Sequence, residues 1–272
     1  MSVPQVLSAD WPAPPGVRAV VTLRAGGVSG GAYASLNLGA HVGDDAQAVA
    51  ENRRRMAAAL RLPAEPLWLA QVHGTGVVRA DELGHGAVAP ITIARGDASI
   101  TRQPGRVLAV LVADCLPVLL ARADGSAVAI AHAGWRGLAA GVVEAAVYSI
   151  GGQPLELVAW LGPAIGAAHF EVGEKVRAAF CRHSAQAASA FEANERGRWQ
   201  CDLHQLAAQR LAALGVHSIH GQPRCTFADA DSFYSFRRDG VTGRAAALVW
   251  MDARVAGRTD VAARRSTVEH RG

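Results

Sequence analysis

Apolar residues in this chain form short continuous runs and longer amphipathic stretches, which together predict a mixed α and β protein. Three continuous runs in the middle of the chain, at 107–112, 118–121 and 127–131, are typical of strands buried on both faces. Asp124 and Gly125 separate the second run from the third. An Asp-Gly pair between two apolar runs predicts a β-hairpin, so we expect these two strands to pair antiparallel.

The register of this hairpin brings two reactive side chains together. If Asp124 and Gly125 form the centre of the turn, His132 lies opposite Pro117. Cys115 is two residues further along its strand, and the period of two puts it on the same face as His132. Diagonal neighbours of this kind lie within reach of one another, so one metal ion would be able to bridge the sulfur and the imidazole.

Amphipathic patterning and flanking residues predict four helices, at 46–61, 134–150, 172–182 and 203–214. Two further buried strands are expected at 155–161 and 245–251. Helices and strands do not alternate regularly, which argues against a doubly wound parallel sheet. No repeat or interdomain linker is visible. We therefore expect a single catalytic domain over 1–252, followed by a polar, arginine-rich tail at 253–272 that frays.

Composition excludes several classes of protein. A chain of 272 residues can bury a large core as one domain. Half of its residues are hydrophobic, but charged residues interrupt the apolar runs before any reaches membrane-spanning length, and residues 1–5 carry no secretory signal pattern. The four cysteines lack the spacing of a disulfide framework. These features predict a cytoplasmic enzyme with reduced thiols and no membrane partner.

The net charge of +4 is modest and scattered along the chain. No basic stripe with interleaved aromatic residues is present, which argues against nucleic acid as a partner. Of the 27 basic residues only Lys175 is a lysine, a bias that a GC-rich coding sequence explains for most positions. Arginine also suits bidentate binding of phosphate or carboxylate. We expect that role only at Arg24, Arg136, Arg237, Arg238 and Arg244.

Three short segments carry candidate metal ligands. His73, Cys115 and His132 each stand at the end of an apolar run, close to a glycine or a proline. Two histidines and one cysteine fill three of the four positions around zinc and leave the fourth for water or substrate, as in catalytic zinc sites. The spacing matches no standard zinc motif, and a single cysteine at a strand end is usually a small buried hydrophobe. Spacing alone does not place His73 near the other two.

Further short segments rich in glycine and polar residues are spread over most of the chain. They read T-L-R-A-G-G-V-S at 22–29, S-L-N-L-G at 35–39, H-V-G-D-D at 41–45, E-N-R at 51–53, Q-V-H-G at 71–74, G-D-A at 96–98, A-D-C at 113–115, H-A-G-W-R-G at 132–137, G-P-A-I-G at 162–166 and F-R-R-D-G-V-T-G-R at 236–244. In this order they resemble the YfiH family of cytoplasmic proteins. Its members carry names such as polyphenol oxidase, laccase domain protein, peptidoglycan editing factor and purine nucleoside phosphorylase.

The resemblance implies both a fold and an activity. The fold is a single α+β layered domain with mixed β-sheets and flanking helices. The activity is that of a zinc-dependent purine nucleoside phosphorylase acting on adenosine, inosine and S-methyl-5′-thioadenosine with phosphate, with adenosine deaminase activity besides. The resemblance also implies His73, Cys115 and His132 as the zinc ligands, because the corresponding family segments bind zinc through these residue types.

Other residues in these segments are candidates for chemistry on the nucleoside. We expect catalytic roles for Cys115, Asp114 and Arg136, and substrate-binding roles for Arg24, Asn37, Asp97, Arg237 and Arg244. Asp114 and Asp97 suit proton transfer or contact with ribose hydroxyls, and either is equally suited to a structural cap. Arg136 follows His132 at a predicted helix start, where free N–H groups favour an anion, and it is our first choice for phosphate. Alternatively, Trp135 anchors the core and Arg136 is a surface residue.

Two other activities and one non-enzymatic role stay open on the sequence. Cys115 and His132 alone would satisfy a metal-free cysteine hydrolase or transferase, as nucleophile and base. A Cys-His-His site also binds copper, as copper-dependent phenol oxidation by a laccase requires. A multicopper cluster is typically built from H-x-H pairs, and the ten histidines here include no such pair. A role in editing peptidoglycan precursors through a partner is the third alternative, and the oligomeric state is left open.

Overall fold

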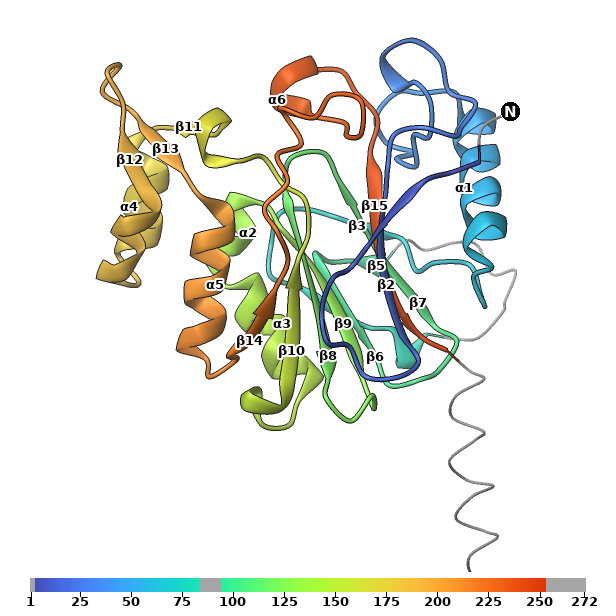
Figure 1. Cartoon of the computed structure of the whole chain (residues 1–272), viewed down its shortest axis with the longest axis horizontal. Helices are drawn as coiled ribbons and strands as arrows, with labels where there is room; N and C mark the ends of the chain where they lie inside the picture. Colours follow the sequence, from blue (N-terminus) through green and yellow to red (C-terminus); the bar gives the residue numbers. More distant parts are fainter. Residues whose placement is uncertain (1–2, 84–93, 253–272) are drawn as a thin grey trace, which may run out of the picture.

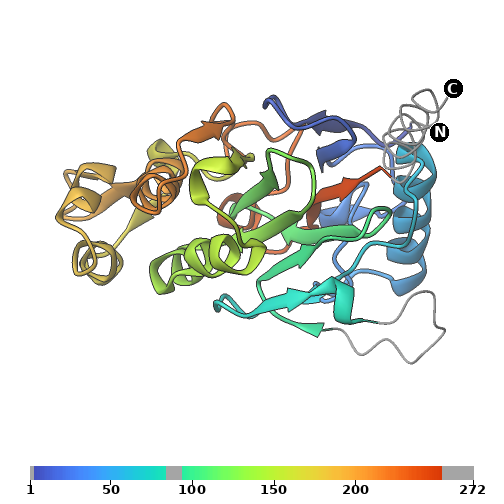
Figure 2. The same ribbon diagram turned by 90° about the horizontal axis from the view of Figure 1, so that it is seen from below.

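The structure, a computed structural model, describes residues 3–83 and 94–252, and in them two β-sheets are stacked between helices (Figure 1). One outer layer is helix α1 (Ala46–Leu60) and the other is a group of helices on the far side of the sheets (Figure 2). This arrangement confirms the predicted α+β fold with layered, mixed sheets. The predicted tail at 253–272 lies outside the described residues.

The four-stranded sheet joins strands from both ends and the middle of the chain. Its order is β1 (Val6–Ser8), β2 (Val17–Thr22), β15 (Ala245–Met251) and β7 (Val107–Val112). All of its strand pairs are antiparallel. The predicted strands at 107–112 and 245–251 match β7 and β15, in which every residue is buried.

The six-stranded sheet is mixed and carries the predicted hairpin at its centre. Its order is β14 (Ser218–His220), β10 (Leu157–Leu161), β8 (Leu116–Arg122), β9 (Val128–Ala133), β6 (Ala98–Thr101) and β4 (Val77–Arg79). The edge strands β14 and β4 pair in parallel with their neighbours, and the other pairs are antiparallel. Pro117 pairs with His132 as predicted, and Gly125 occupies the turn with a φ of 72°.

Two predicted helices form close to their expected bounds. Helix α1 follows Asp45 and helix α5 (Leu203–Ala213) follows Asp202, and each carboxylate accepts hydrogen bonds from backbone N–H groups of the first turn. Gly215 follows the end of α5 with a φ of 90°. The polar caps thus mark both helices in the sequence as well as in the structure.

The prediction of one helix over 134–150 is wrong. The segment forms α2 (Trp135–Ala140) and α3 (Val142–Ile150), separated by Gly141 with a φ of 105°. The N–H of Gly141 bonds to the carbonyls of Gly137 and Leu138 and so closes α2. Apolar residues continue on both sides of the break, so the helical pattern alone does not reveal it.

A small lobe follows β10 and lies at the left of Figure 1. It contains a sheet of order β11 (Glu171–Val172), β13 (Trp199–Cys201) and β12 (Phe191–Ala193), and the helix α4 (Glu174–Cys181). The predicted helix 172–182 starts late, because residues 171 and 172 pair with β13 instead. The predicted strand 155–161 also starts late, because Pro154 opens a short 3₁₀ turn.

Alternate side chains of the sheets form three apolar layers. Between the sheets, Val110 of β7 and Ile130 of β9 belong to one buried cluster. On the outer face of the six-stranded sheet, Leu120 belongs to a cluster with residues of α2, α3 and α5. On the outer face of the four-stranded sheet, Leu248 clusters with Met56 of α1. Burial of both faces explains why these strands read as continuous apolar runs.

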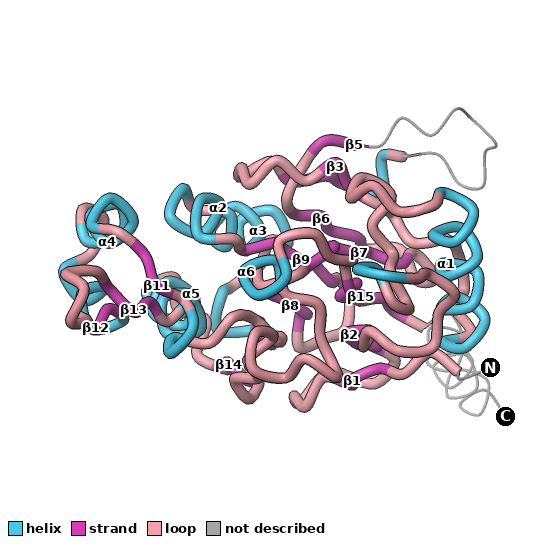
Figure 3. The backbone as a smooth tube through the Cα atoms, turned by 90° about the horizontal axis from the view of Figure 1, so that it is seen from above, coloured by secondary structure: helices cyan, strands magenta, loops and turns pink. Residues whose placement is uncertain are grey.

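The remaining elements are a short pair of strands, a short helix and several 3₁₀ turns. Strands β3 (Leu69–Ala70) and β5 (Ala94–Arg95) form a parallel pair, and α6 (Phe236–Asp239) lies at the top of Figure 1 and near the centre of Figure 3. Short 3₁₀ helices occupy Gly31–Tyr33, Ala80–Glu82, Pro154–Glu156, Ala167–His169 and Ala185–Ala190. No helix in the described part of the chain has the length and apolar surface that crossing a membrane requires.

Candidate metal centre and its cavity

The structure brings the three candidate metal ligands together. The ligand atoms of His73, Cys115 and His132 all lie within 4.8 Å of one another, and the Cys115 sulfur is 4.0 Å from Nε2 of His73. His132 is buried at the end of β9, Cys115 is half-buried before β8, and His73 is exposed in the loop after β3. Among the described residues, this is the one group of three or more such side chains able to hold a metal ion.

Two backbone features allow the three ligands to approach so closely. Asp114, just before Cys115, has a φ of 90°, and His73 has a φ of 60°. Both conformations are uncommon for residues other than glycine. At Gly134, an added Cβ would lie 2.8 Å from the Cys115 sulfur and 2.9 Å from Cδ2 of His73. Only glycine therefore leaves room for the two ligands to meet over the start of α2.

The buried carboxylate of Asp97 holds two of the ligands in place. Its side chain is fully buried, and Oδ1 accepts hydrogen bonds from Nδ1 of His132 at 2.9 Å and from the N–H of His73 at 2.9 Å. Oδ2 accepts from the N–H groups of Val72 and Gly74. A carboxylate that accepts from Nδ1 leaves Nε2 of the histidine as the free ligand atom. Asp97 does not line the cavity described below. Its hydrogen bonds support the two histidine ligands and do not point to contact with substrate, the role expected from the sequence.

Hydrogen bonds also fix the charge of Asp97. Burial by itself would raise the pKa of the carboxyl group. Bonds from His132 and from the N–H groups of Gly74 and Val72 outweigh that effect and hold the pKa below its usual value. The carboxylate is therefore ionised at neutral pH and favours a proton on Nδ1 of His132.

Cys115 and His132 shift each other's protonation in the absence of metal. Burial opposes the charged form of both, but His132 and His73 lower the pKa of the Cys115 thiol to about 6. Against the same opposition from burial, Cys115 and Asp97 raise the pKa of His132 to about 9. The sulfur thus favours the thiolate, which is the form that binds metal ions. His132 must release a proton to bind one, so metal and protons compete for the site.

The chemistry of this donor set fits a metal ion. Two imidazole nitrogens and one thiolate suit zinc, and they suit copper as well. Three protein ligands leave one position open, which is the arrangement of catalytic rather than structural zinc sites. The metal identity is not decided by these donors, because copper binds such ligands at least as tightly as zinc.

The ligands stand in the wall of a cavity of about 450 Å³, a volume in the range of small-molecule sites. Three arginines line the same cavity, and each guanidinium lies over an aromatic ring that also lines it. The pairs and their distances from Cζ to the ring centroid are Arg136 with Trp135 at 4.5 Å, Arg237 with Phe170 at 5.2 Å and Arg244 with Phe236 at 5.7 Å. The cavity therefore combines flat apolar faces with cationic groups.

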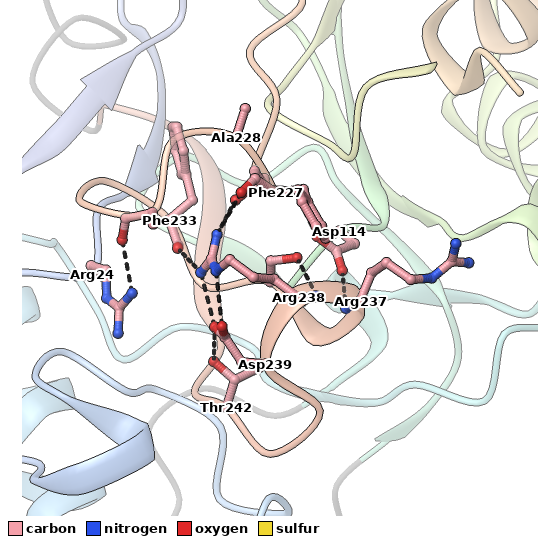
Figure 4. Close-up of polar contacts among 12 residues, drawn as sticks. Arg24, Asp114, Phe227, Ala228, Phe233, Arg237, Arg238, Asp239 and Thr242 are labelled. Atoms are coloured by element: carbon pink, nitrogen blue, oxygen red, sulfur yellow. Dashed lines mark hydrogen bonds and ion pairs between the residues drawn. The ribbon is translucent and has the colours of Figure 1, made fainter. Parts of the chain in front are cut away.

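Asp114 lines this cavity as the acidic residue beside Cys115, but both of its carboxylate oxygens are occupied. Oδ1 accepts from Thr226 Oγ1 and Oδ2 accepts from the N–H of Arg237, each at 2.7 Å. These bonds tie α6 to the start of β8, as Figure 4 shows for Arg237. The structural alternative for Asp114 is the one these contacts favour.

Besides Asp97, two more of the expected substrate-binding residues lie outside the cavity lining. Arg24 donates to the carbonyls of Ala34 and Ala230, and its guanidinium lies over the ring of Tyr234. Asn37 is fully buried and bonds to backbone groups of its own loop and of Arg244. The structure thus gives both residues partners within the fold.

Arg238, another arginine of the α6 segment, is also committed to the fold. Its guanidinium donates to the carbonyls of Thr226, Phe227 and Phe233 and pairs with Asp239 (Figure 4). The side chain of the neighbouring Arg237 points away from this network. Adjacent arginines of one short motif therefore serve different purposes.

Arg136 is exposed at the start of α2, while Trp135 is partly buried and packs against the core cluster on the outer face of the six-stranded sheet. Trp135 thus follows the structural alternative stated above. Arg136 nevertheless lines the cavity. Helix α2 has six residues, so its macrodipole adds little to the attraction of an anion.

Several residues of the cavity have no role predicted from the sequence. His41, Phe170 and Phe236 all line it, and Phe236 is 57% exposed. His41 and Phe236 stand inside segments that carried the family resemblance, which was a usable signal. Phe170 follows the 162–166 segment and carries no comparable signal, because its place depends on how the small lobe packs.

Comparison with known proteins places this chain in a family. A family model described as multi-copper polyphenol oxidoreductase laccase matches residues 18–252. A purine nucleoside phosphorylase of Pseudomonas aeruginosa is 52% identical over 246 residues, covering 90% of this chain and 98% of the relative. The purine nucleoside phosphorylase YfiH of Escherichia coli is 48% identical over 242 residues, covering 89% and 97%.

Solved structures agree with these matches. Protein NMB0706 of Neisseria meningitidis superposes with a TM-score of 0.86 at 46% identity, covering 91% of this chain and 99% of its own. YlmD from Geobacillus stearothermophilus has a TM-score of 0.81 at 33% identity, covering 89% and 94%. The stacked sheets are therefore those of a laccase-like domain protein. The chain belongs to the YfiH family.

Proposed function

We propose that the protein is a metal-dependent purine nucleoside phosphorylase. It cleaves adenosine, inosine and S-methyl-5′-thioadenosine with phosphate, and it deaminates adenosine as a second reaction. Zinc is the metal, held by His73, Cys115 and His132. Two lines of support are the names of relatives that this chain matches over nine-tenths of its length and the donor set of the site.

The observation that carries the proposal is the excess of positive charge in the cavity. Arg136, Arg237 and Arg244 line it, and no carboxylate among the described residues lies within ion-pair distance of them. Asp114, an acidic residue of the same lining, has both oxygens occupied. A cavity of this kind favours an anionic reactant beside a flat apolar one, which matches phosphate and a purine nucleoside.

In phosphorolysis a phosphate oxygen forms a bond to C1′ of the ribose while the bond from C1′ to N9 breaks. The electron pair of the broken bond leaves with the purine, which takes up a proton from water. Held arginines contribute by placing the phosphate beside C1′ and by balancing its charge. The aromatic faces of Trp135, Phe170 and Phe236 exclude water and offer stacking surfaces for the base.

A bound zinc ion would supply Lewis acidity at the wall of the cavity. Asp97 keeps the imidazole of His132 oriented toward that wall, and the thiolate of Cys115 balances part of the metal charge. Deamination of adenosine requires water at C6 and releases ammonia. It needs no phosphate, and so it uses the same cavity without the arginines.

Copper-dependent phenol oxidation is the second candidate, and the description of the matching family model favours it. A multicopper cluster requires more ligands than one group of three, and the described residues offer only His73, Cys115 and His132. A metal-free cysteine hydrolase would use the same sulfur and imidazole. Metal content and products separate the three activities.

The test is reconstitution of metal-free protein with zinc or with copper. Each form is assayed with adenosine, inosine and S-methyl-5′-thioadenosine and with a phenolic substrate under oxygen. We expect nucleoside cleavage to return with zinc and to be absent in the metal-free form. Phenol oxidation by the copper form together with no nucleoside cleavage by either form would favour the oxidase. Full activity without metal would favour the cysteine hydrolase.

A further inference from the structure

Arg244 has surroundings unlike those of the other two arginines of the cavity. Its backbone N–H donates to Oδ1 of the fully buried Asn37 at 2.8 Å, and the same oxygen accepts from the N–H of Gly39. An added Cβ at Gly39 would lie 2.8 Å from Cγ of Arg244. The loop that begins at Asn37 thus packs directly on the stem of the arginine side chain and limits its motion.

The guanidinium of Arg244 has hydrogen-bond partners at Nη1 but none at Nε and Nη2 among the described residues. Nη1 donates to the carbonyls of Thr242 and Gly243 at 2.9 and 3.0 Å. The Nε and Nη2 edge is the one that binds two oxygens of a phosphate or carboxylate side by side.

The charge of Arg244 is half-buried and has no carboxylate within ion-pair distance among the described residues. Burial lowers the pKa of this guanidinium, whereas the charges of Cys115 and Asp114 act in the opposite direction. Partial burial lowers the pKa of His41, and the charge of Arg244 lowers it further. A buried charge without a partner is costly, and an incoming anion removes that cost.

We propose that Arg244 binds the phosphate of the reaction through its Nε and Nη2 edge, and that Asn37 is a positioning residue for it. The proposal rests on the phosphorylase function proposed above and names the residue that binds its phosphate. Asn37 touches no ligand in this account. It holds the backbone of Arg244, and the side chain of Arg244 packs on Gly39, a position where only glycine fits.

Arg136 and Arg237 are less suited to this role. Both side chains are exposed, so water screens their charge and each loses more side-chain freedom on binding. Arg237 also donates to the carbonyl of Glu171 at 3.0 Å. Our first choice from the sequence, Arg136, has no hydrogen bond in the described structure that would hold its guanidinium in one orientation.

The test measures binding of inorganic phosphate to zinc-loaded full-length protein and its variants. Arg244→Lys keeps the positive charge but loses the two parallel N–H donors of the guanidinium, and Arg244→Gln loses the charge as well. Arg182→Lys, at an exposed position after α4, is the matched control. We expect phosphate to raise the Tm of the wild type and of the control, but to have little effect on Arg244→Gln.

Steady-state kinetics with inosine give the second measurement. For Arg244→Lys we expect the KM for phosphate to rise by about tenfold or more, about 1.4 kcal/mol. The KM for inosine at saturating phosphate should change by no more than about twofold, since in this proposal the guanidinium of Arg244 does not contact the purine base. A purely structural role would instead change both KM values and lower the Tm without phosphate.

The positioning role of Asn37 has its own readout. Asn37→Ala should raise the KM for phosphate and leave the KM for inosine nearly unchanged, in the fraction of protein that remains folded. An unchanged KM for phosphate in this variant would remove Asn37 from the account.

The outcomes separate this proposal from the proposed function. If the wild type requires phosphate but Arg244→Lys and Arg244→Gln bind it normally while Arg136→Lys does not, Arg244 is the wrong residue and the phosphorylase function stands. If the wild type cleaves inosine equally well without phosphate, the function itself fails. Loss of the phosphate-induced rise in Tm in both Arg244 variants, with the control unaffected, supports the proposal.

Discussion

The cavity has two walls that are built by different means. The metal wall consists of His73, Cys115 and His132, with Asp97 behind them, and it joins the ends of the central strands β8 and β9 to the loop after β3. The arginine wall consists of Arg136, Arg237 and Arg244 with their aromatic partners, and it comes from loops and short helices far apart in the chain. The cavity therefore lies between a side supported by a buried carboxylate and a side with two exposed arginines.

The difference between the walls is one of energy as well as position. Asp97 accepts four hydrogen bonds as a buried anion, and bonds to charged groups contribute about 1.5–3 kcal/mol each. An exposed guanidinium over a ring contributes only about 0.5–1 kcal/mol. We therefore expect the loop of His73 and the ring of His132 to be held in place before a ligand binds, and the exposed arginines to become ordered on binding. Arg244 is the exception, because Asn37 fixes it in advance.

The largest expected effect is loss of the metal wall itself. Cys115→Ala removes the single sulfur ligand, and we expect both metal content and nucleoside cleavage to fall to background. Elemental analysis of protein purified without chelator measures the first, and a nucleoside assay measures the second. Cys181→Ala, at a half-buried thiol of α4, should retain both. Full metal occupancy in the Cys115 variant would remove this residue from the site.

A smaller effect should follow from changing the support of the wall and keeping its ligands. Asp97→Asn replaces a carboxylate that accepts four hydrogen bonds with an amide that cannot accept them all. Loss of such a support typically weakens metal affinity by about 10–100-fold. Competition with a metal-binding dye measures this affinity. Asp124→Asn, in the hairpin turn, is the control, and equal affinity in both variants would contradict the role given to Asp97.

Removal of the metal should affect the site more than the fold. The core clusters of both sheets are buried without any contribution from the metal, so metal-free protein should keep a native far-UV circular dichroism spectrum. Its Tm should fall, because a ligand that binds the folded state stabilises it. Global unfolding on chelation would show that the metal site is structural, and would contradict a metal wall that only serves the cavity.

The smallest expected effect is on the pH dependence of stability, and it follows from a comparison of two buried histidines. Burial opposes the charged form of His132, but Cys115 and Asp97 outweigh it and raise the pKa of that ring. Burial lowers the pKa of His204, which is 7% exposed and bonds through Nε2 to the carbonyl of Gly162. Unfolding frees His204 to take up a proton near pH 6.5, and the folded state takes it up only at lower pH. Stability from this group is therefore full above pH 6.5 and is lost as the pH falls toward the folded pKa.

His204→Gln keeps a donor for the carbonyl and removes the titration. We expect its Tm to fall less than that of the wild type between pH 8 and about pH 5.5. His217→Gln, at an exposed histidine, is the control and should follow the wild type. An identical loss of Tm in His204→Gln and in the wild type would show that other groups govern stability in this range.

The two walls also differ in how far the sequence predicts them. The hairpin, its register and the pairing of Pro117 with His132 follow from an Asp-Gly turn and a period of two, which are local signals. The break of 134–150 at Gly141 leaves the apolar pattern intact, so that pattern predicts one helix where there are two. Local signals also cannot distinguish Arg238, which bonds to backbone carbonyls, from Arg237 one residue earlier. That distinction depends on tertiary packing.

Asp97 illustrates the same limit within the metal wall. A carboxylate in a glycine-rich segment suggests contact with substrate as readily as support of a ligand. Only the meeting of the loop 72–74 with β9 gives it four donors. The family resemblance covers both walls, but it names ligands and not the residues that hold them.

The central claim is that the cavity joins a metal centre to an arginine that holds phosphate, and one measurement tests it most directly. Zinc-loaded wild-type protein is incubated with inosine in buffer with and without phosphate, and the sugar product is identified. The account predicts hypoxanthine and ribose 1-phosphate with phosphate, and no cleavage without it. Cleavage at full rate in phosphate-free buffer, with free ribose as the product, would contradict it.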